Sequence, residues 1–295
     1  GKSGDKPVLI SFNPFGKAFL ALSTLQTKQN MRLGIISALS EEQQGLVEAM
    51  QSPYKLIHGQ REYWVGQLWE IDAVCVLSRI GKVAAAVTTT TLVEKFGVTH
   101  ILFTCVAGAG YKSIQVGDIV VAESLVQHDM DASPLFPRFE VPLTGLTHFP
   151  ADHRLAARLV DAAYAFLDSD FETAIDPSEK TVFGLRQPRI HRGLIASGDQ
   201  FVNDRAHING LNAALPGLVA VEMEGAAVAQ VCHELGVPCA VIRTISDNAN
   251  ENAATDFLRF VKSVAAQYAY HIVRRFCLQD EALMEGQASR ESAGT

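Results

Sequence analysis

Three acidic residues, Glu42, Glu224 and Asp247, each stand just after an apolar run that is typical of a buried strand. The carboxyl ends of parallel strands meet at one rim of a sheet, so these residues can come together despite their separation in sequence. Three acids without a basic cluster or a Ser–His pair argue against acyl transfer. They suit acid/base chemistry on a sugar, in which one acid activates water, one protonates a leaving group and one binds hydroxyl groups.

Two carboxylates, Glu222 and Glu224, flank Met223 where the apolar stretch Val219–Val221 gives way to a helix beginning near Gly225. Carboxylates are rarely buried unless they are paired or hydrogen-bonded, which favours a ligand site here. A simpler interpretation is that the acids complement the positive end of the helix dipole, and it applies equally to the acids after the first strand. The stretch alone does not separate the two interpretations.

The alternation of apolar runs and turn residues predicts one α/β unit over residues 31–277, without repeats or an internal boundary. The predicted strands cover 31–36, 63–68, 73–77, 100–106, 119–122, 192–197, 219–221 and 239–245. The predicted helices cover 83–96, 153–167, 226–235 and 255–276. Ser40, followed by acids, is the expected N-cap of a further helix. Segment 168–187 is polar and irregular, which indicates an insertion or a mobile loop.

The two ends of the chain differ from this unit. The apolar stretch within residues 1–30 is too short and too late for a signal peptide, so we expect a leader or vector-derived segment, or an ill-assigned start, ahead of Met31. Residues 278–295 are polar and rich in Gly, Ser and Glu, which predicts a disordered tail.

The composition argues against several classes of partner. The formal net charge is −7, and an acidic chain is a poor ligand for nucleic acid or for an anionic membrane. No apolar run reaches the ~18–20 residues that span a bilayer. The five cysteines are scattered in apolar contexts without a Cys-x-x-Cys pair. This pattern favours buried reduced thiols in a cytoplasmic protein over a disulfide framework or a zinc site.

Two glycine-containing turns invite comparison with phosphate-binding loops. Ser78–Lys82 follows a strand and opens a helix, where an anion can bind, but the Walker pattern is missing. Ala107–Gly110 resembles half of a dinucleotide fingerprint, but a new strand follows in place of the required helix. What remains is a turn where the backbone can approach a ligand closely, or a tight connection between strands.

The stretch His128–Asp131 places one His and two Asp close together, in a spacing that matches no standard metal motif. The segment Pro134–Pro150 that follows is rich in Pro and Phe, which indicates an ordered loop with exposed apolar surface, such as a lid or a subunit contact. Phe201 follows another glycine-containing turn, and it either stacks on a planar ring or belongs to the core.

Six motifs occur in order along the chain: Gly34–Ala38 with Glu41–Glu42, Ile80–Ala85, Val116–Val120, Ser197–Val202, Val221–Glu224 and Arg243–Asp247. Together they closely resemble the 5′-methylthioadenosine/S-adenosylhomocysteine nucleosidases, a family of the nucleoside phosphorylase superfamily. The resemblance covers about residues 31–277. It implies a single-domain, three-layer α/β/α fold around a mixed, twisted central sheet, and a homodimer.

The resemblance implies irreversible hydrolysis of the N-glycosidic bond of a small-molecule nucleoside, which yields adenine and a 5-thio-substituted ribose. Glu42 would hold and activate the attacking water, and Asp247 would donate a proton to adenine N7. Nearby carboxylates would favour the positive charge of the oxocarbenium-like sugar. Neither a cofactor nor a metal is implied.

The resemblance also implies a set of substrate-binding residues, at the positions that match the motifs of the family. Glu224 would accept hydrogen bonds from ribose hydroxyls, and Met223 would pack under the sugar. Phe201 would stack on adenine, whose edge the Val202 backbone would contact, and Ser246 would help to orient the proton donor. The remaining members of the predicted set are Ile80, Val106, Ala107, Gly108 and Glu222.

The chain departs from the family pattern at several positions. Val106 stands where the family often has Ser, Ser133–Pro137 replaces its usual Ala-Phe-Gly-Tyr, and its Phe before the last helix is not matched at Ala253–Ala254. Segment 168–187 has no counterpart. Residues 133–150 of a partner subunit would lie near the 5′ pocket, so the preferred 5′ substituent stays open.

Other functions compete with this hypothesis. A nucleoside phosphorylase of the same fold needs a dianion site, and Glu41 and Glu42 would repel phosphate. A hydrolase of another purine nucleoside, such as futalosine, is harder to separate from the first hypothesis. A non-catalytic nucleoside-binding protein would keep the base and sugar contacts but would not need both Glu42 and Asp247.

Overall fold

The computed structural model describes residues 31–247 and 253–292. The leader predicted at 1–30 lies outside these residues.

Within the described residues, ten strands form one mixed sheet. They are β1 (Arg32–Ser37), β2 (Gln51–His58), β3 (Arg61–Leu68), β4 (Ile71–Leu77), β5 (His100–Ala109), β6 (Ile119–Gln127), β7 (Phe149–Pro150), β8 (Ile190–Ser197), β9 (Leu218–Glu222) and β10 (Cys239–Asp247). Strands β4, β1, β5 and β10 lie side by side and run parallel, whereas β2 and β3 add an antiparallel edge.

One half of the sheet closes on itself. Strand β10 pairs with both β5 and β6, and β6 continues through β8 and β9 back to β5. Strands β5 and β9 run in opposite directions and pair only through Gly108 with Val221 and Ala109 with Ala220, near the carboxyl end of each strand. The carboxyl ends of β5 and β10 therefore meet those of β8 and β9 head-on. The prediction places all of the acids at one rim of a mostly parallel sheet. It is wrong because β9 runs antiparallel to β5 and reaches the site from the opposite direction.

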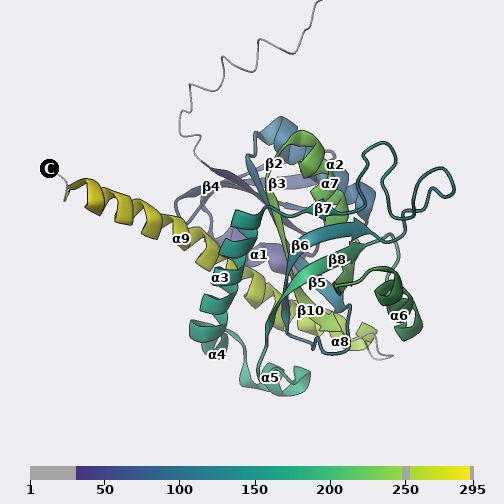
Figure 1. Cartoon of the computed structure of the whole chain (residues 1–295). Coiled ribbons are helices and arrows are strands. Elements are labelled where there is room, and N and C mark those ends of the chain that lie inside the picture. The colour runs from purple at the N-terminus through teal and green to yellow at the C-terminus, as the bar shows by residue number, and fades with distance from the viewer. Residues whose placement is uncertain (1–30, 248–252, 293–295) are drawn as a thin grey trace, which may run out of the picture. The chain divides into compact units, whose positions relative to one another are not determined.

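The helices form two layers, one on each side of the sheet (Figure 1). They are α1 (Ser40–Ala49), α2 (Lys82–Phe96), α3 (His153–Ser169), α4 (Phe171–Ala174), α5 (Pro177–Phe183), α6 (Arg205–Ala214), α7 (Gly225–Leu235), α8 (Ala253–Phe260), the π-helical turn η1 (Val261–Ala265) and α9 (Ala266–Ser292). Helices α1 and α3 pack against α9, and α2 packs against α7. The predicted three-layer α/β/α arrangement is confirmed.

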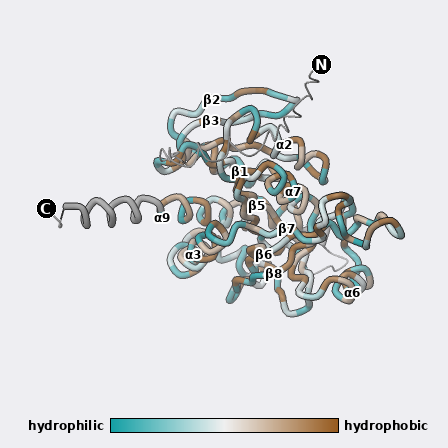
Figure 2. Tube along the Cα trace, turned by 45° about the horizontal axis from the view of Figure 1, so that its top comes forward, coloured by the Kyte–Doolittle hydropathy of each residue, from teal (hydrophilic) through white to brown (hydrophobic). Residues whose placement is uncertain are grey.

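The central strands are buried because helices cover both faces, as their continuous apolar runs require. Leu33, Val74 and Phe103 on β1, β4 and β5 are fully buried. In contrast, every residue of β2 at the edge of the sheet is exposed, and Figure 2 shows hydrophilic and hydrophobic stretches side by side in this strand. A second, smaller apolar cluster includes Ile208 and Leu211 and packs α6 against β8 and β9. It fixes the far end of the loop that runs from β8 to α6.

Most predicted elements agree with the structure within a few residues, but β2 is absent from the predicted strands. All of its residues are exposed, so the sequence there lacks the alternation of apolar and polar residues that marks a half-buried strand. The Ser40 cap is also wrong, because Leu39 is the N-cap of α1 and no side chain caps the helix. The Ser40 hydroxyl instead donates to Glu41 at 3.0 Å.

Two polar segments are more ordered than the sequence predicts. Segment 168–187 contains α4 and α5, and the Asp176 side chain caps α5 by accepting a hydrogen bond from the Ser178 N–H at 2.7 Å. Helix α9 continues to Ser292, whereas the tail is predicted to begin at residue 278. The tail sequence is rich in Glu, Gln, Ala and Leu, which are good helix formers, and this favours continuation of the helix.

Candidate active site

A cavity of about 730 Å³, counting the space open to solvent, lies where the carboxyl ends of β5, β8, β9 and β10 meet. Apart from Glu42, every residue predicted for the site lines it: Ile80, Val106, Ala107, Gly108, Phe201, Val202, Glu222, Met223, Glu224, Ser246 and Asp247. The head-on meeting of β5 and β9 is what brings these distant segments together.

Glu42, in the first turn of α1, lies behind the wall of the cavity. It is 2% exposed, and its carboxyl group is hydrogen-bonded to the thiol of Cys105, which does line the cavity. Burial raises the pKa of Glu42 to about 8, although the charge of Arg243 and the Cys105 hydrogen bond oppose the rise. Its Oε2 atom has no hydrogen-bond partner within the part of the chain that the structure describes. A carboxyl group with spare acceptor capacity is suited to hold a water molecule and take its proton.

Glu224 stands between β9 and α7, and it is buried against the cavity. Its Oε1 atom accepts a hydrogen bond from the backbone N–H of Gly81 at 2.8 Å. Burial, followed by the negative charge of Glu222, raises the pKa of Glu224 to about 7. The N-terminus of α2 thus orients a carboxyl group that ionises near neutral pH.

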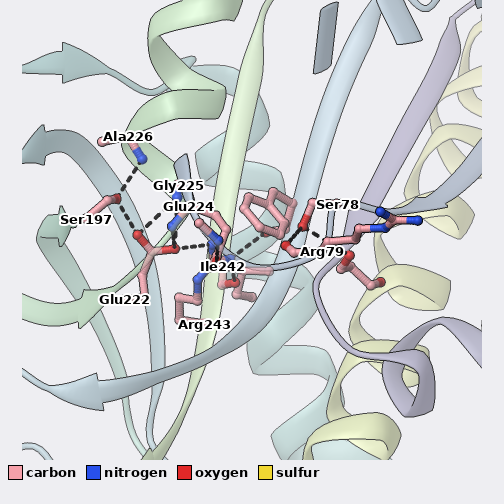
Figure 3. Close-up of polar contacts among 12 residues, drawn as sticks. Ser78, Arg79, Ser197, Glu222, Glu224, Gly225, Ala226, Ile242 and Arg243 are labelled. Carbon is pink, nitrogen blue, oxygen red and sulfur yellow. Dashed lines mark hydrogen bonds and ion pairs between the residues drawn. The ribbon is translucent and has the colours of Figure 1, made fainter. Parts of the chain in front are cut away.

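Glu222 and Arg243 form a buried ion pair at the base of the site (Figure 3). The Arg243 Nη2 atom lies 2.6 Å from Glu222 Oε2, and the Arg243 side chain is fully buried. The guanidinium group also lies 4.0 Å from the centre of the Phe103 ring and donates to the Ile242 carbonyl at 2.9 Å. Removing one member of such a pair leaves an uncompensated buried charge, so the two residues must be retained together.

The remaining contacts of Glu222 hold the turn that leads into α7. The Gly225 N–H donates to Glu222 Oε2 at 2.8 Å, and the Ser197 hydroxyl donates to Oε1. Ser197 in turn accepts a hydrogen bond from the Ala226 N–H at 2.7 Å (Figure 3). Because its oxygens are engaged in this way, Glu222 is better suited to fixing the turn that presents Glu224 than to the substrate contact predicted for it.

Asp247 ends β10 in register with Gly108 of β5. It is buried yet lines the cavity, so it is accessible from the cavity rather than from bulk solvent. The Ser246 hydroxyl donates to Asp247 Oδ2 at 3.1 Å, which is the contact that the resemblance implies.

The rest of the cavity is mostly apolar. Phe201 lines it and is 57% exposed, so the alternative that Phe201 is a core aromatic is wrong. Met223, Ile80 and Val106 add further apolar surface. An apolar cavity wall beside buried carboxylates suits a planar ring attached to a sugar.

Several residues of the site are missing from the predicted set, and three of them bear on its chemistry. Arg243 could have been found, because a charge within the apolar run of β10 requires a buried partner. No sequence pattern identifies Cys105, since its contact with Glu42 depends on how α1 packs against β5. Phe257, on α8, lines the cavity and adds an aromatic side chain to it.

The motifs that suggest phosphate or metal binding are engaged elsewhere. Lys82 Nζ lies 2.6 Å from Asp129 Oδ1, and Arg79 donates to the Gln60 carbonyl at 2.5 Å. The five cysteines are all free and buried. No helix in residues 31–247 or 253–292 combines the length and the apolar character needed to cross a membrane.

The electrostatics of the cavity are one-sided. Glu222, Glu224 and Asp247 line it, and no Lys, Arg or His is among its described lining residues, although Arg243 balances the charge of Glu222 from behind the wall. In a site shielded from water, such carboxylates stabilise a positive charge that develops on a ligand. They also repel an anion such as phosphate. The arrangement therefore suits cleavage through a cationic sugar, with water rather than phosphate as the acceptor.

The sequence is similar to those of known nucleosidases. The family described as the phosphorylase superfamily matches residues 32–277. The 5′-methylthioadenosine/S-adenosylhomocysteine nucleosidase of Shewanella denitrificans is 35% identical over 243 residues, which are 82% of this chain and 97% of that relative.

Solved structures share the fold. The Neisseria meningitidis 5′-methylthioadenosine/S-adenosylhomocysteine nucleosidase in complex with methylthio-immucillin-A has a TM-score of 0.73 and 30% identity, over 83% of this chain and 97% of that one. The native futalosine hydrolase of Helicobacter pylori has a TM-score of 0.72 and 31% identity, over 86% of this chain and all of that one. The predicted fold class is confirmed.

Proposed function

The chain belongs to the phosphorylase superfamily, and on that premise we propose that it hydrolyses the N-glycosidic bond of 5′-methylthioadenosine and S-adenosylhomocysteine. The products are adenine and the 5-thio-substituted ribose. The observation that carries the proposal is the acidic cavity, which has three carboxylates and no basic side chain among its described lining residues. A phosphorylase would need cationic or backbone donors for a phosphate dianion at this place.

In the proposed reaction, the bond between the sugar and N9 of the base lengthens and positive charge spreads over the sugar ring. Asp247 donates a proton to N7, so the base leaves as a neutral molecule. Glu42 in its ionised form accepts a proton from a water molecule, whose oxygen attacks the anomeric carbon. Glu224 accepts hydrogen bonds from the 2′- and 3′-hydroxyl groups, and its charge favours the positive charge on the sugar.

The base and the 5′ group take the apolar parts of the cavity. Phe201 stacks on the purine, and the Val202 backbone contacts its edge. Met223 packs under the sugar, and Phe257 closes the side formed by α8. Glu222 and Arg243 act as positioning residues. Their contacts hold the turn before α7, and those contacts already engage the carboxylate oxygens of Glu222.

We also propose that the enzyme is a cytoplasmic homodimer in which residues 133–150 of the partner subunit lie near the 5′ pocket. The free buried cysteines are consistent with a reducing compartment. Leu135 and Leu143 in this segment are 84% and 91% exposed, which is unusual for leucine side chains on a stable surface. Burial against a second copy would remove this surface from water.

The second candidate is hydrolysis of another purine nucleoside. It is favoured by the likeness to the Helicobacter pylori futalosine hydrolase, whose TM-score lies within 0.01 of that of the Neisseria meningitidis enzyme. The two candidates share the sugar chemistry and differ in the base and in the 5′ substituent.

The test is release of free base from 5′-methylthioadenosine, S-adenosylhomocysteine and futalosine, each with and without phosphate, with Glu42→Gln as the inactive control. We expect adenine release from the first two in phosphate-free buffer, unchanged by added phosphate. Release that requires phosphate and yields a sugar 1-phosphate would make the protein a phosphorylase. Cleavage of futalosine alone would select the second candidate.

A further inference from the structure

Three charged residues beside the cavity close a ring of hydrogen bonds: Lys82, Asp129 and Asp199. Lys82 Nζ donates to Asp129 Oδ1 at 2.6 Å. Asp129 Oδ2 accepts from the Asp199 N–H at 2.9 Å, and Asp199 Oδ1 accepts from the backbone N–H of Lys82 at 2.8 Å. We call this set the Lys82 ring. It accounts for two motifs that the proposed reaction leaves unused, the Lys after Gly81 and the first Asp after His128.

The Lys82 ring joins three segments of the site. Asp199 lies two residues before Phe201, on the loop between β8 and α6. Lys82 opens α2, directly after Gly81, whose N–H holds Glu224. Asp129 follows the end of β6. A displacement of the loop relative to the helix would therefore break at least one of the three hydrogen bonds.

We infer that Lys82, Asp129 and Asp199 are positioning residues that set the loop 198–202, and with it Phe201, at a fixed place relative to Glu224. The inference rests on the proposed function, in which Phe201 binds the base and Glu224 binds the sugar. None of the three ring members lines the cavity. They act through the two residues that do.

The packing beside the ring supports this role. A Cβ atom at Gly198 would stand 2.4 Å from the ring of the buried His128, so the loop is in contact with the end of β6 there as well. At the other end of the loop, Val202 packs against the apolar cluster of α6. The loop is thus held on both sides of Phe201, which itself projects into the cavity and stays largely exposed.

The ring is sheltered enough for its charges to matter. The side chains of Lys82 and Asp129 are only 16% and 25% exposed. Burial by itself would raise the pKa of Asp129, but the hydrogen bonds from Lys82 and Asp199 outweigh it and hold that pKa below its usual range. Asp129 is therefore charged at neutral pH. Lys82 Nζ also donates to Gln127 Oε1 at 3.0 Å, which fixes the amine in place.

The test uses Lys82→Met, which removes the amine but keeps the backbone N–H that binds Asp199. Hydrogen–deuterium exchange of the free protein follows the amides of 198–204, and steady-state kinetics use the nucleoside that the wild-type enzyme cleaves. We expect exchange in 198–204 to be roughly threefold to tenfold faster, because the loop loses one charge-assisted anchor. We expect KM to rise by about 5- to 20-fold with a smaller change in kcat, and the Tm to stay near that of the wild type.

Two further variants sharpen the test. Asp129→Asn on the Lys82→Met background should add little, because residues that act as one unit are not additive. Lys180→Met is the matched control, since it removes a Lys amine that lies 2.7 Å from Glu172 with a similarly sheltered side chain, 14% exposed, in the α4–α5 segment. Its exchange in 198–204 and its KM should equal those of the wild type.

Unchanged exchange and unchanged KM in Lys82→Met would overturn the inference. Faster exchange with an unchanged KM would also overturn it, because the ring would then order the loop without positioning the base. Exchange is measured without substrate, so it remains informative even if the wild-type protein cleaves none of the nucleosides offered. Failure to cleave any of these nucleosides would count against the proposed function and not against the ordering of the loop by the Lys82 ring.

Discussion

Cys105 on β5 stands in register with Arg243 on β10, and both residues act on the carboxyl group of Glu42 from α1. The thiol does so by a hydrogen bond and the guanidinium by its charge, and both lower the pKa of Glu42 against the larger effect of burial. A strand pair thus adjusts the ionisation of a carboxyl group contributed by a helix. This relationship has consequences for the dependence of activity on pH.

On the acid side, the dependence of kcat/KM on pH should reflect the ionisation of Glu42. It must be ionised to accept a proton from water, and burial raises its pKa to about 8. We therefore expect kcat/KM to fall as the pH drops through this range. Cys105→Ala removes a hydrogen bond that lowers the pKa, so its acid limb should lie at higher pH, and Cys105→Ser should restore it. Identical profiles for all three proteins would show that the thiol does not act on Glu42.

Glu42→Gln should lose activity and gain stability. In the folded protein Glu42 binds its proton more tightly than in the unfolded chain, so its contribution to stability is present at low pH and is lost as pH rises from about 4.5 to about 8. The neutral amide of Gln cannot ionise, so the variant does not lose stability in this way as the pH rises. At pH 7 the variant should therefore be more stable by a few kcal/mol, on the order of 2–4. Urea denaturation at pH 5 and pH 7.5 measures it, and a gain that does not grow with pH would contradict the account.

Arg243→Met should be strongly destabilising, because it leaves the Glu222 carboxylate buried without its charge partner. We expect a loss of about 3–5 kcal/mol in the free energy of unfolding. Adding Glu222→Gln on this background should recover part of the loss, since no net charge then remains buried. Denaturant unfolding of the single and double variants measures the coupling. Equal stability of the two proteins would mean that the ion pair is not the source of the effect.

Phe201→Leu should weaken base binding without affecting the fold. Phe201 is largely exposed in the cavity and contributes little to the core, so the Tm should stay near that of the wild type. Loss of stacking on the base should weaken adenine binding by roughly 1–3 kcal/mol. Isothermal calorimetry with adenine measures this, and Phe183→Leu, whose ring packs against Phe260 away from the cavity, is the control. Equal affinity in the Phe201 variant and in the wild type would remove Phe201 from base recognition.

The exposed leucines of segment 133–150 give a test of the proposed dimer. Leu135→Asp together with Leu143→Asp places two charges where apolar surface would be buried between copies. Analytical ultracentrifugation should then show dissociation at protein concentrations where the wild type is a dimer. Activity should fall with it, because the 5′ pocket would lose its partner segment. A wild-type protein that sediments as a monomer would contradict the proposal.

Much of this protein is determined by its sequence alone. Apolar runs and turn residues predict nearly all of the buried strands and the longer helices, because those patterns are local properties of the chain, but they miss α4, α5 and α6. The resemblance of six motifs to a known family predicts the lining of the cavity, from Ile80 through Asp247, although Glu42 lies behind its wall. The exposed strand β2 cannot be predicted in the same way, since an edge strand with no buried residues has no periodic signal.

Only the tertiary structure decides how the strand ends are joined. The pairing of Gly108 with Val221 and of Cys105 with Arg243 brings together residues more than 100 positions apart, and no local pattern specifies such a register. The same contacts decide which acids are free to act. Glu222 is engaged by Arg243, whereas Glu42 retains an unpartnered oxygen within the described residues, although the sequence presents both simply as acids near strand ends. Burial and charge pairing depend on the packed neighbours, and that is why the ionisation of these groups follows from the fold.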